Sequence, residues 1–139
     1  MLSFATTWLF VIKLINMKIL IIDAALDKIL FKIIDKDQSY TTDHLNCREN
    51  FDNFVELLFS FLKRNNTNIG EINKIFVNQG PGKFSGIRAS ISVAKSLSLT
   101  NNLDLYGFNS DQFLEKNHEK LIKLANEGVL KKNLIKPNY

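Results

Sequence analysis

One stretch decides how the middle of this chain folds: Val77-Asn78-Gln79-Gly80-Pro81-Gly82-Lys83-Phe84-Ser85-Gly86-Ile87-Arg88. It predicts a buried strand over Lys74–Asn78, a Gly-Pro-Gly turn, and a helix that begins at Ser85 or Gly86. Three of the chain's six glycines fall within seven positions here, so the backbone needs conformations or close approaches that a side chain would prevent. Such a junction points backbone N–H groups outward, which suits an anion, and it also lets a protein partner come close.

The residues before this stretch predict three strands and a helix. Ile19–Ile22 is an all-apolar run, typical of a strand buried on both faces. Lys28–Ile34 and Gln38–Asp43 follow as two more strands, and their tight spacing predicts an antiparallel meander with the third strand near an edge. Over Arg48–Arg64 apolar residues recur every three or four positions, which indicates one amphipathic helix of about four turns.

The helix predicted over Gly86–Thr100 has two distinct faces. One is an apolar stripe suited to packing on a sheet, formed by Ile87, Ile91, Ala94 and Leu97. The other is unusually small, formed by Ala89, Ser90, Ser92, Val93 and Ser96. Because small side chains let another helix approach, this second face is expected to pack against something.

The rest of the chain completes a single α/β domain. Leu103–Phe108 predicts a further strand, and Asn109 with Gln112 three positions later resembles a capping box. A helix is expected through Asn117, a second from His118 to Glu127, and a basic, polar tail over the last ten residues. The order βββ-α-β-α-β-α predicts a mixed sheet with helices packed on it.

Composition and charge set limits on the function. At 139 residues, 45% hydrophobic and 23% charged, the chain is long enough for one globular domain with a real core. The net charge of +4 is mild and its acids and bases are interleaved, so nothing argues for a nucleic-acid surface. Cys47 is the sole cysteine, which excludes an intrachain disulfide and fits a reducing cytoplasm.

Residues 1–16 form an apolar extension ahead of the first strand. It lacks the basic start and the small-residue cleavage site of a signal peptide. Lys13 and Lys18 interrupt it before the roughly 18–20 apolar residues that a membrane span needs, so we expect no membrane partner. Two explanations stay open: Met17 is the true start of translation, or the extension is a hydrophobic anchor or an extra packing element.

The glycine stretch matches neither standard phosphate cradle. A Walker A motif needs Gly-Lys-Ser/Thr in direct sequence, and Phe84 separates Lys83 from Ser85. The dinucleotide fingerprint fails as well, because its third glycine would stand one position before Gly86. We therefore expect a structural turn, with Gly82, Ser85 and Gly86 as weak candidates for a phosphate contact.

No catalytic or metal-binding set is predicted. Asp23 ends the first strand, where actin-like ATPases hold a metal-coordinating carboxylate, but Ala24 and Ala25 follow it without a hydroxyl, which favours a turn-stabilising role. His44 and His118 are the only histidines and lie far apart, which argues against a zinc or iron site. Without a nucleophile, base and orienting group in a recognisable pattern, the sequence favours a binding surface over an active site.

The glycine stretch resembles the signature of the TsaB (YeaZ) family, which is close to Gly-Arg-Gly-Pro-Gly-Ser-Phe-Thr-Gly-Leu-Arg. The matching residues are Gly80, Pro81, Gly82, Phe84, Gly86 and Arg88. Met17–Asp23, Arg48–Asn50 and Leu105–Ser110 extend the resemblance, which thus covers residues 17–114 in order. Ala125–Tyr139 is similar to the extreme C-terminus of the family, so the chain resembles a shortened member that lacks most of the second domain.

This resemblance implies an actin-like (ASKHA, ribonuclease H-like) fold over residues 17–114, followed by a C-terminal helix and basic tail over 115–139. It also implies a non-catalytic role. TsaB proteins support TsaD in forming N6-threonylcarbamoyladenosine at position 37 of tRNAs that read ANN codons, and TsaE belongs to the same pathway. Contact with tRNA would be indirect. The resemblance implies no cofactor of the chain's own and leaves open ATP or ADP with Mg²⁺ at or near the TsaD interface.

By the same resemblance, two helices would pair with equivalent helices of TsaD, or of a second copy of this chain. We assign the contact to the outward faces of residues 50–62 and 86–98. The candidate residues are Asn50, Phe54, Leu58, Phe84, Arg88, Ser92 and Lys95. The alternative function is a nucleotide-binding enzyme of the actin and sugar-kinase class that uses Asp23 and Gly82–Gly86.

Overall fold

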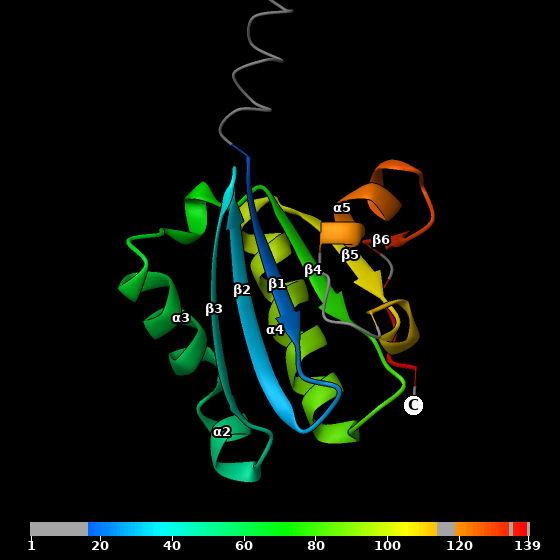
Figure 1. Cartoon of the computed structure of the whole chain (residues 1–139). Helices are drawn as coiled ribbons and strands as arrows, with labels where there is room; N and C mark the ends of the chain where they lie inside the picture. Colours follow the sequence, from blue (N-terminus) through cyan, green and yellow to red (C-terminus); the bar gives the residue numbers. More distant parts are fainter. Residues whose placement is uncertain (1–16, 114–118, 134, 139) are drawn as a thin grey trace, which may run out of the picture.

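A computed structural model describes residues 17–113, 119–133 and 135–138. In these residues six strands form one sheet in the order β3-β2-β1-β4-β5-β6 (Figure 1). Their bounds are β1 Lys18–Asp23, β2 Lys28–Asp35, β3 Gln38–Leu45, β4 Lys74–Asn78, β5 Asp104–Phe108 and β6 Lys131–Lys132. The predicted meander is confirmed, since β1, β2 and β3 pair antiparallel and β3 lies at the edge. Because β1, β4 and β5 run parallel and β6 pairs antiparallel to β5, the sheet is mixed.

The helices largely follow the predicted pattern. Their bounds are α2 Arg48–Asp52, α3 Phe54–Arg64, α4 Phe84–Asn101 and α5 Glu119–Asn126, with short 3-10 turns η1 Ile69–Glu71 and η2 Ser110–Phe113. The single helix expected over Arg48–Arg64 is wrong, because the chain breaks at Asn53. There the Asn53 side chain donates to the Glu49 carbonyl at 3.2 Å, a local bond that competes with a continuous helix. The helix expected through Asn117 and the predictions for residues 1–16 lie outside the described residues.

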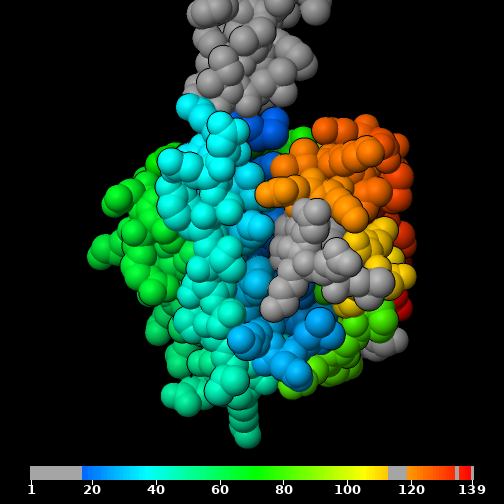
Figure 2. Space-filling view, viewed as in Figure 1, coloured from blue at the N-terminus to red at the C-terminus, as the bar shows by residue number. Residues whose placement is uncertain are grey.

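The central strands β1, β4 and β5 are buried on both faces, and different helices cover the two faces. Leu20 and Ile22 of β1 point into a core shared with α3 and α4, and Ile19 and Ile21 point into a second core that contains Leu121 of α5. This alternation confirms β1 as a strand buried on both sides. Figure 2 shows the face of the molecule that carries α5. There α5 (orange) lies on the right, and β2 and β3 (cyan) are visible on the left. The outer surfaces of α3 and α4 are therefore presented on the opposite side of the molecule.

The sequence predicts a tail over the last ten residues, but the described ones among them, 130–133 and 135–138, pack against the domain. Lys131 and Lys132 pair with β5, and Ile135 is fully buried in the core beneath α4. The basic composition of this segment predicts exposure, but strand pairing at the edge of β5 leaves Lys131 and Lys132 exposed while Leu130 and Ile135 are buried. The division of the chain at residue 114 into two parts stays a prediction.

Candidate partner-binding surface

The glycine turn packs tightly against the chain's own β1–β2 turn. A Cβ atom on Gly82 or Gly86 would collide with the backbone carbonyl oxygen of Ala25 or Ala24, respectively. The Lys83 backbone N–H donates to the Ala25 carbonyl at 2.7 Å and fixes the junction. These two glycines thus serve internal packing at the start of α4. Ser85, in the first turn of α4, is exposed.

A polar network joins the carboxyl ends of β1, β4 and β5, the edge at which open α/β sheets commonly bind ligands. The Asn78 Nδ2 donates to Asp23 Oδ1 at 3.0 Å and to Ser110 Oγ at 3.1 Å, and Asn78 Oδ1 accepts from the Gly80 N–H at 2.8 Å. Ser110 Oγ in turn donates to the Pro81 carbonyl at 2.8 Å. The network therefore uses these polar groups to hold the glycine turn against the sheet.

Asp23 sits in this network with the geometry of a turn-stabilising residue. Its Oδ1 also accepts from the Ala25 N–H at 3.4 Å, two residues along the chain, which is the pattern of an Asx turn. Across the described part of the chain, no group of three or more His, Cys, Asp and Glu side chains could hold a metal ion.

On α3 the assignment of Phe54 and Leu58 to the contact surface is wrong. Their side chains are 2% and 0% exposed and belong to the core. The exposed apolar residues of this helix are Val55 at 50% and Phe59 at 40%. Both pairs are spaced by four residues, so the helical period alone does not distinguish the inner pair from the outer one. Asn50 is half-buried, and its Nδ2 donates to the Leu45 carbonyl at 2.8 Å, which ties α2 to the end of β3.

On α4 the predicted residues do reach the surface. Phe84, Arg88 and Ser92 are exposed and Lys95 is half-buried. The Arg88 guanidinium lies 5.0 Å from the centroid of the Phe84 ring, a cation–π arrangement. Leu99, 86% exposed, continues the same outer stripe four residues beyond Lys95 and was missed, although the periodicity of the stripe could have included it.

The small face predicted on α4 is split by the structure. Ser90 is fully buried and donates to the Ile87 carbonyl at 3.0 Å, so it faces the sheet. Ala89 and Val93 are half-buried against the core beneath α4. Only Ser92 and Ser96 of this set are exposed, and in the sequence they lie between the exposed apolar residues Phe84 and Leu99 of the same helix.

We define the helix-pair surface as Val55 and Phe59 of α3 with Phe84, Arg88 and Leu99 of α4. Both helices pack on the same core, so these outward side chains lie on one side of the molecule. Single exposed apolar residues are common on proteins. Several of them on two helices of one layer, with an arginine and two phenylalanines among them, are typical of a contact surface.

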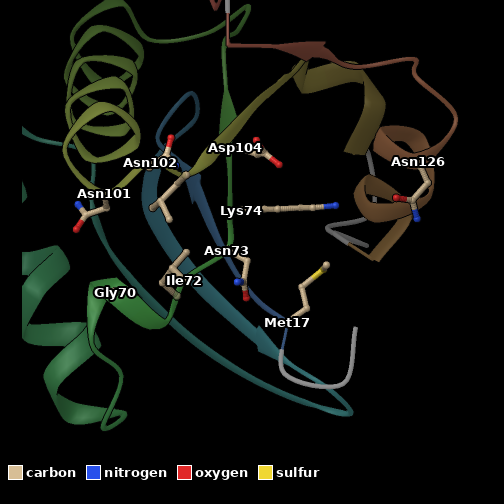
Figure 3. Close-up of a pocket in the computed structure, with 10 residues that line it drawn as sticks. Met17, Gly70, Ile72, Asn73, Lys74, Asn101, Asn102, Asp104 and Asn126 are labelled. Atoms are coloured by element: carbon tan, nitrogen blue, oxygen red, sulfur yellow. The ribbon is translucent and has the colours of Figure 1, made fainter. Parts of the chain in front are cut away.

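A separate cavity of about 700 Å³ lies at the other end of the sheet, where β4 and β5 begin (Figure 3). Lys74, Asp104 and Asn126 are among its lining residues, and Lys74 extends across it towards Asn126. The Lys74 ammonium lies 5.7 Å from the centroid of the Tyr106 ring. None of the predicted site residues lines this cavity.

Comparison with known proteins identifies the family. Residues 46–129 match the family model of "TsaD: tRNA N6-adenosine threonylcarbamoyltransferase". The chain belongs to this family. Two relatives are named tRNA threonylcarbamoyladenosine biosynthesis protein TsaB. That of Buchnera aphidicola subsp. Baizongia pistaciae is 33% identical over 86 residues, and that of subsp. Schizaphis graminum is 30% identical over 93 residues. The membership in the TsaB/YeaZ family predicted from the glycine signature is confirmed.

The chain is short relative to these TsaB proteins. The matches cover 61% and 66% of this chain but only 38% and 44% of the two relatives. The solved structure of YeaZ from Pseudomonas aeruginosa aligns with a TM-score of 0.67 at 14% identity, over 77% of this chain and 50% of YeaZ. This likeness confirms the actin-like, ribonuclease H-like fold. Among the described helices of this TsaB/YeaZ member, none is long and apolar enough to cross a membrane.

Proposed function

We propose that the chain is a non-catalytic subunit that supports TsaD in forming N6-threonylcarbamoyladenosine at position 37 of tRNAs that read ANN codons. The observation that carries the proposal is the helix-pair surface in a chain of this family. TsaD binds there, TsaE acts with the complex, and tRNA is contacted through these partners.

The chemistry of the surface supports a protein partner. Aromatic residues and arginine are enriched in the centres of protein interfaces, and Phe59, Phe84 and Arg88 supply both kinds. Arg88 already stacks on Phe84, so part of the ordering cost of a contact is met before binding. Glu56 is exposed on α3 and Arg88 on α4; opposite charges on the two helices would help set the orientation of the partner.

The polar network at the carboxyl ends of the strands supports a non-catalytic role. Asn78 is 1% exposed and its side-chain atoms bond to Asp23, Ser110 and the Gly80 N–H. A nucleotide phosphate that bonded to these side-chain atoms would compete with those internal bonds. We therefore place ATP or ADP with Mg²⁺ in the complex with TsaD, and expect no saturable Mg²⁺-dependent ATP binding by the isolated chain in calorimetry. Such binding would support the alternative, a nucleotide-binding enzyme.

The direct test is titration of the chain with the TsaD of the same organism by isothermal calorimetry. Truncating a hot-spot residue at the centre of an interface costs about 2 kcal/mol or more, which is about 30-fold in Kd. We expect Phe84→Ala and Phe59→Ala each to weaken binding by about this factor. Val129→Ala is the matched control, because Val129 is an exposed apolar residue that follows α5, the helix on the other face of the sheet.

Two results would overturn the proposal. One is the absence of a complex at micromolar concentrations of both proteins. The other is unchanged affinity in both phenylalanine variants, which would move the contact off the helix-pair surface. Sedimentation velocity of the chain alone tests the competing homodimer: a dimer lost in Phe84→Ala would mean that a second copy uses the same surface.

A further inference from the structure

The C-terminal residues run from the edge of the sheet to the glycine turn. We call residues 130–133 and 135–138 the C-terminal strap. Leu130 packs in the core beneath α5 and Ile135 in the core beneath α4, so the strap joins both layers. In Figure 1 its end (red) lies beside the segment that follows β4 (green). Asn138 thus lies against the glycine turn that precedes α4.

The first half of the strap is held by β5. Besides the pairing of Lys131 and Lys132 with β5, the Asn133 N–H donates to the Leu105 carbonyl at 2.8 Å. The Asn133 side chain accepts from the Leu105 N–H at 3.3 Å. This reciprocal pair of bonds ends the β6 pairing and fixes the direction in which the chain continues.

Gly107 leaves the space that the second half of the strap fills. A Cβ atom on Gly107 would lie 2.8 Å from Cδ1 of Ile135, closer than real carbon contacts allow. Ile135 is fully buried in the same core as Ile87 of α4. The absence of a side chain at Gly107 therefore lets Ile135 anchor the strap beneath the helix that carries the helix-pair surface.

Asn138 then closes the strap on the glycine turn. Its N–H donates to the Gln79 carbonyl at 2.6 Å. Its own carbonyl oxygen lies so close to Gly80, where φ is +110°, that a Cβ there would collide with it, while Ile87 Cδ1 would lie 3.0 Å away on the α4 side. Gly80 is thus enclosed between the strap and the first turn of α4.

We propose that the Ile135 side chain and the backbone N–H of residue 138 position α4: the strap holds the glycine turn and thereby presents the helix-pair surface in a binding-competent orientation. The part of the inference that concerns partner affinity rests on the proposed function. A helix held in place before binding loses less conformational freedom on binding. Releasing the strap should therefore make residues 79–88 more mobile. It should also lower the affinity for the partner, although no residue of the helix-pair surface is substituted.

The test uses single substitutions in the full chain. Asn138→Pro removes the N–H that bonds to Gln79, and Asn138→Ala is its matched control because it keeps that N–H. Ile135→Ala removes the anchor, and Lys136→Ala alters an exposed side chain of the same strap. Hydrogen exchange of the amides in 79–88 is compared with that of β2 and β3, and the affinity for TsaD is measured for each variant.

We expect exchange at residues 79–88 to rise severalfold in Asn138→Pro and at least tenfold in Ile135→Ala, with β2 and β3 unchanged. Affinity for TsaD should fall at least fivefold in both, while Asn138→Ala and Lys136→Ala match the unsubstituted chain. If Ile135→Ala fails to fold, Ile135→Val gives the same local pattern at smaller amplitude.

Two results would overturn the inference. One is unchanged exchange at residues 79–88 in Asn138→Pro and in the Ile135 variant that folds. The other is a rise in exchange of equal size in β2 and β3. A different result would show that only the proposed function fails. If the local rise is seen but the unsubstituted chain does not bind TsaD, the strap still positions α4 and the partner proposal alone fails.

Discussion

Gly86 offers the sharpest test of how the start of α4 is built. The change is Gly86→Ala. In most helices it would be stabilising by roughly 1 kcal/mol, because alanine has the higher helix propensity. Here the added Cβ would overlap the Ala24 backbone carbonyl oxygen and lie 2.9 Å from Nδ2 of Asn46. Since a backbone oxygen cannot rotate away, α4 or the β1–β2 turn must shift.

The expected magnitude follows from these opposing effects. Inserting a methyl group into a packed site commonly costs about 1–3 kcal/mol, and this site lies near the upper end because the obstacle is main chain. After subtracting the helix gain of about 1 kcal/mol, we expect the free energy of unfolding to fall by about 2 kcal/mol. The sign of the change in the free energy of unfolding distinguishes the two effects, because helix propensity predicts an increase and packing predicts a decrease.

Urea unfolding followed by far-UV circular dichroism measures this change. Gly70→Ala and Gly128→Ala are the controls, since a Cβ at either position meets nothing within 4 Å. Gly70→Ala should leave stability within about 0.5 kcal/mol. Gly128 has φ of +73°, so Gly128→Ala should cost about 1–2 kcal/mol through the backbone alone. A Gly86→Ala chain as stable as the original, or more so, would refute the packing account of the glycine turn.

Two further predictions concern buried and exposed polar groups. Asn78→Ala takes an acceptor from the Gly80 N–H and a donor from Asp23, so unfolding measurements should show a loss of about 1–3 kcal/mol; a change below about 0.5 kcal/mol would contradict it. The hydrogen bond from the Lys18 ammonium lowers the pKa of Glu71, so this pair stabilises the fold above the ordinary glutamate pKa and less as the pH falls through the lowered value. The urea midpoint of Glu71→Gln should thus lie below that of the original chain at pH 7 and converge with it in acid; a gap that persists in acid would exclude this pair as its source.

Local patterns were sufficient for strands β1 to β5 and for the glycine turn. The all-apolar run of β1 predicts burial on both faces wherever the strand is placed, and the short spacing to β2 and β3 leaves little room for anything but hairpins. The glycine content of Gly80–Gly86 predicts a close approach. It does not predict what approaches, and in the fold this is the chain's own Ala24 and Ala25.

The orientation of α3 could not be predicted from its own residues. Phe54 with Leu58 and Val55 with Phe59 are both apolar pairs with a spacing of four, so either could face the sheet. The fold buries the first pair, and the Phe54 ring meets the ring of Phe31 edge-on at 5.4 Å between centroids. Phe31 and Phe54 are 23 positions apart in the sequence, so the helical periodicity of α3 cannot predict their contact.

The sequence by itself determined the class of fold, the order of strands β1 to β5 with helical segments between them, and the family signature in the glycine turn, because each depends on neighbours within a few positions. It did not determine the break at Asn53 or the strand β6. Only the tertiary structure decided which side chains of α3 and α4 stay exposed, and that the basic C-terminal residues return to the turn. Ile135 is buried because Gly107, 28 positions earlier (107 to 135), leaves space for it. Such pairings depend on how distant segments meet in three dimensions, and this is why the partner surface needed the fold to be located.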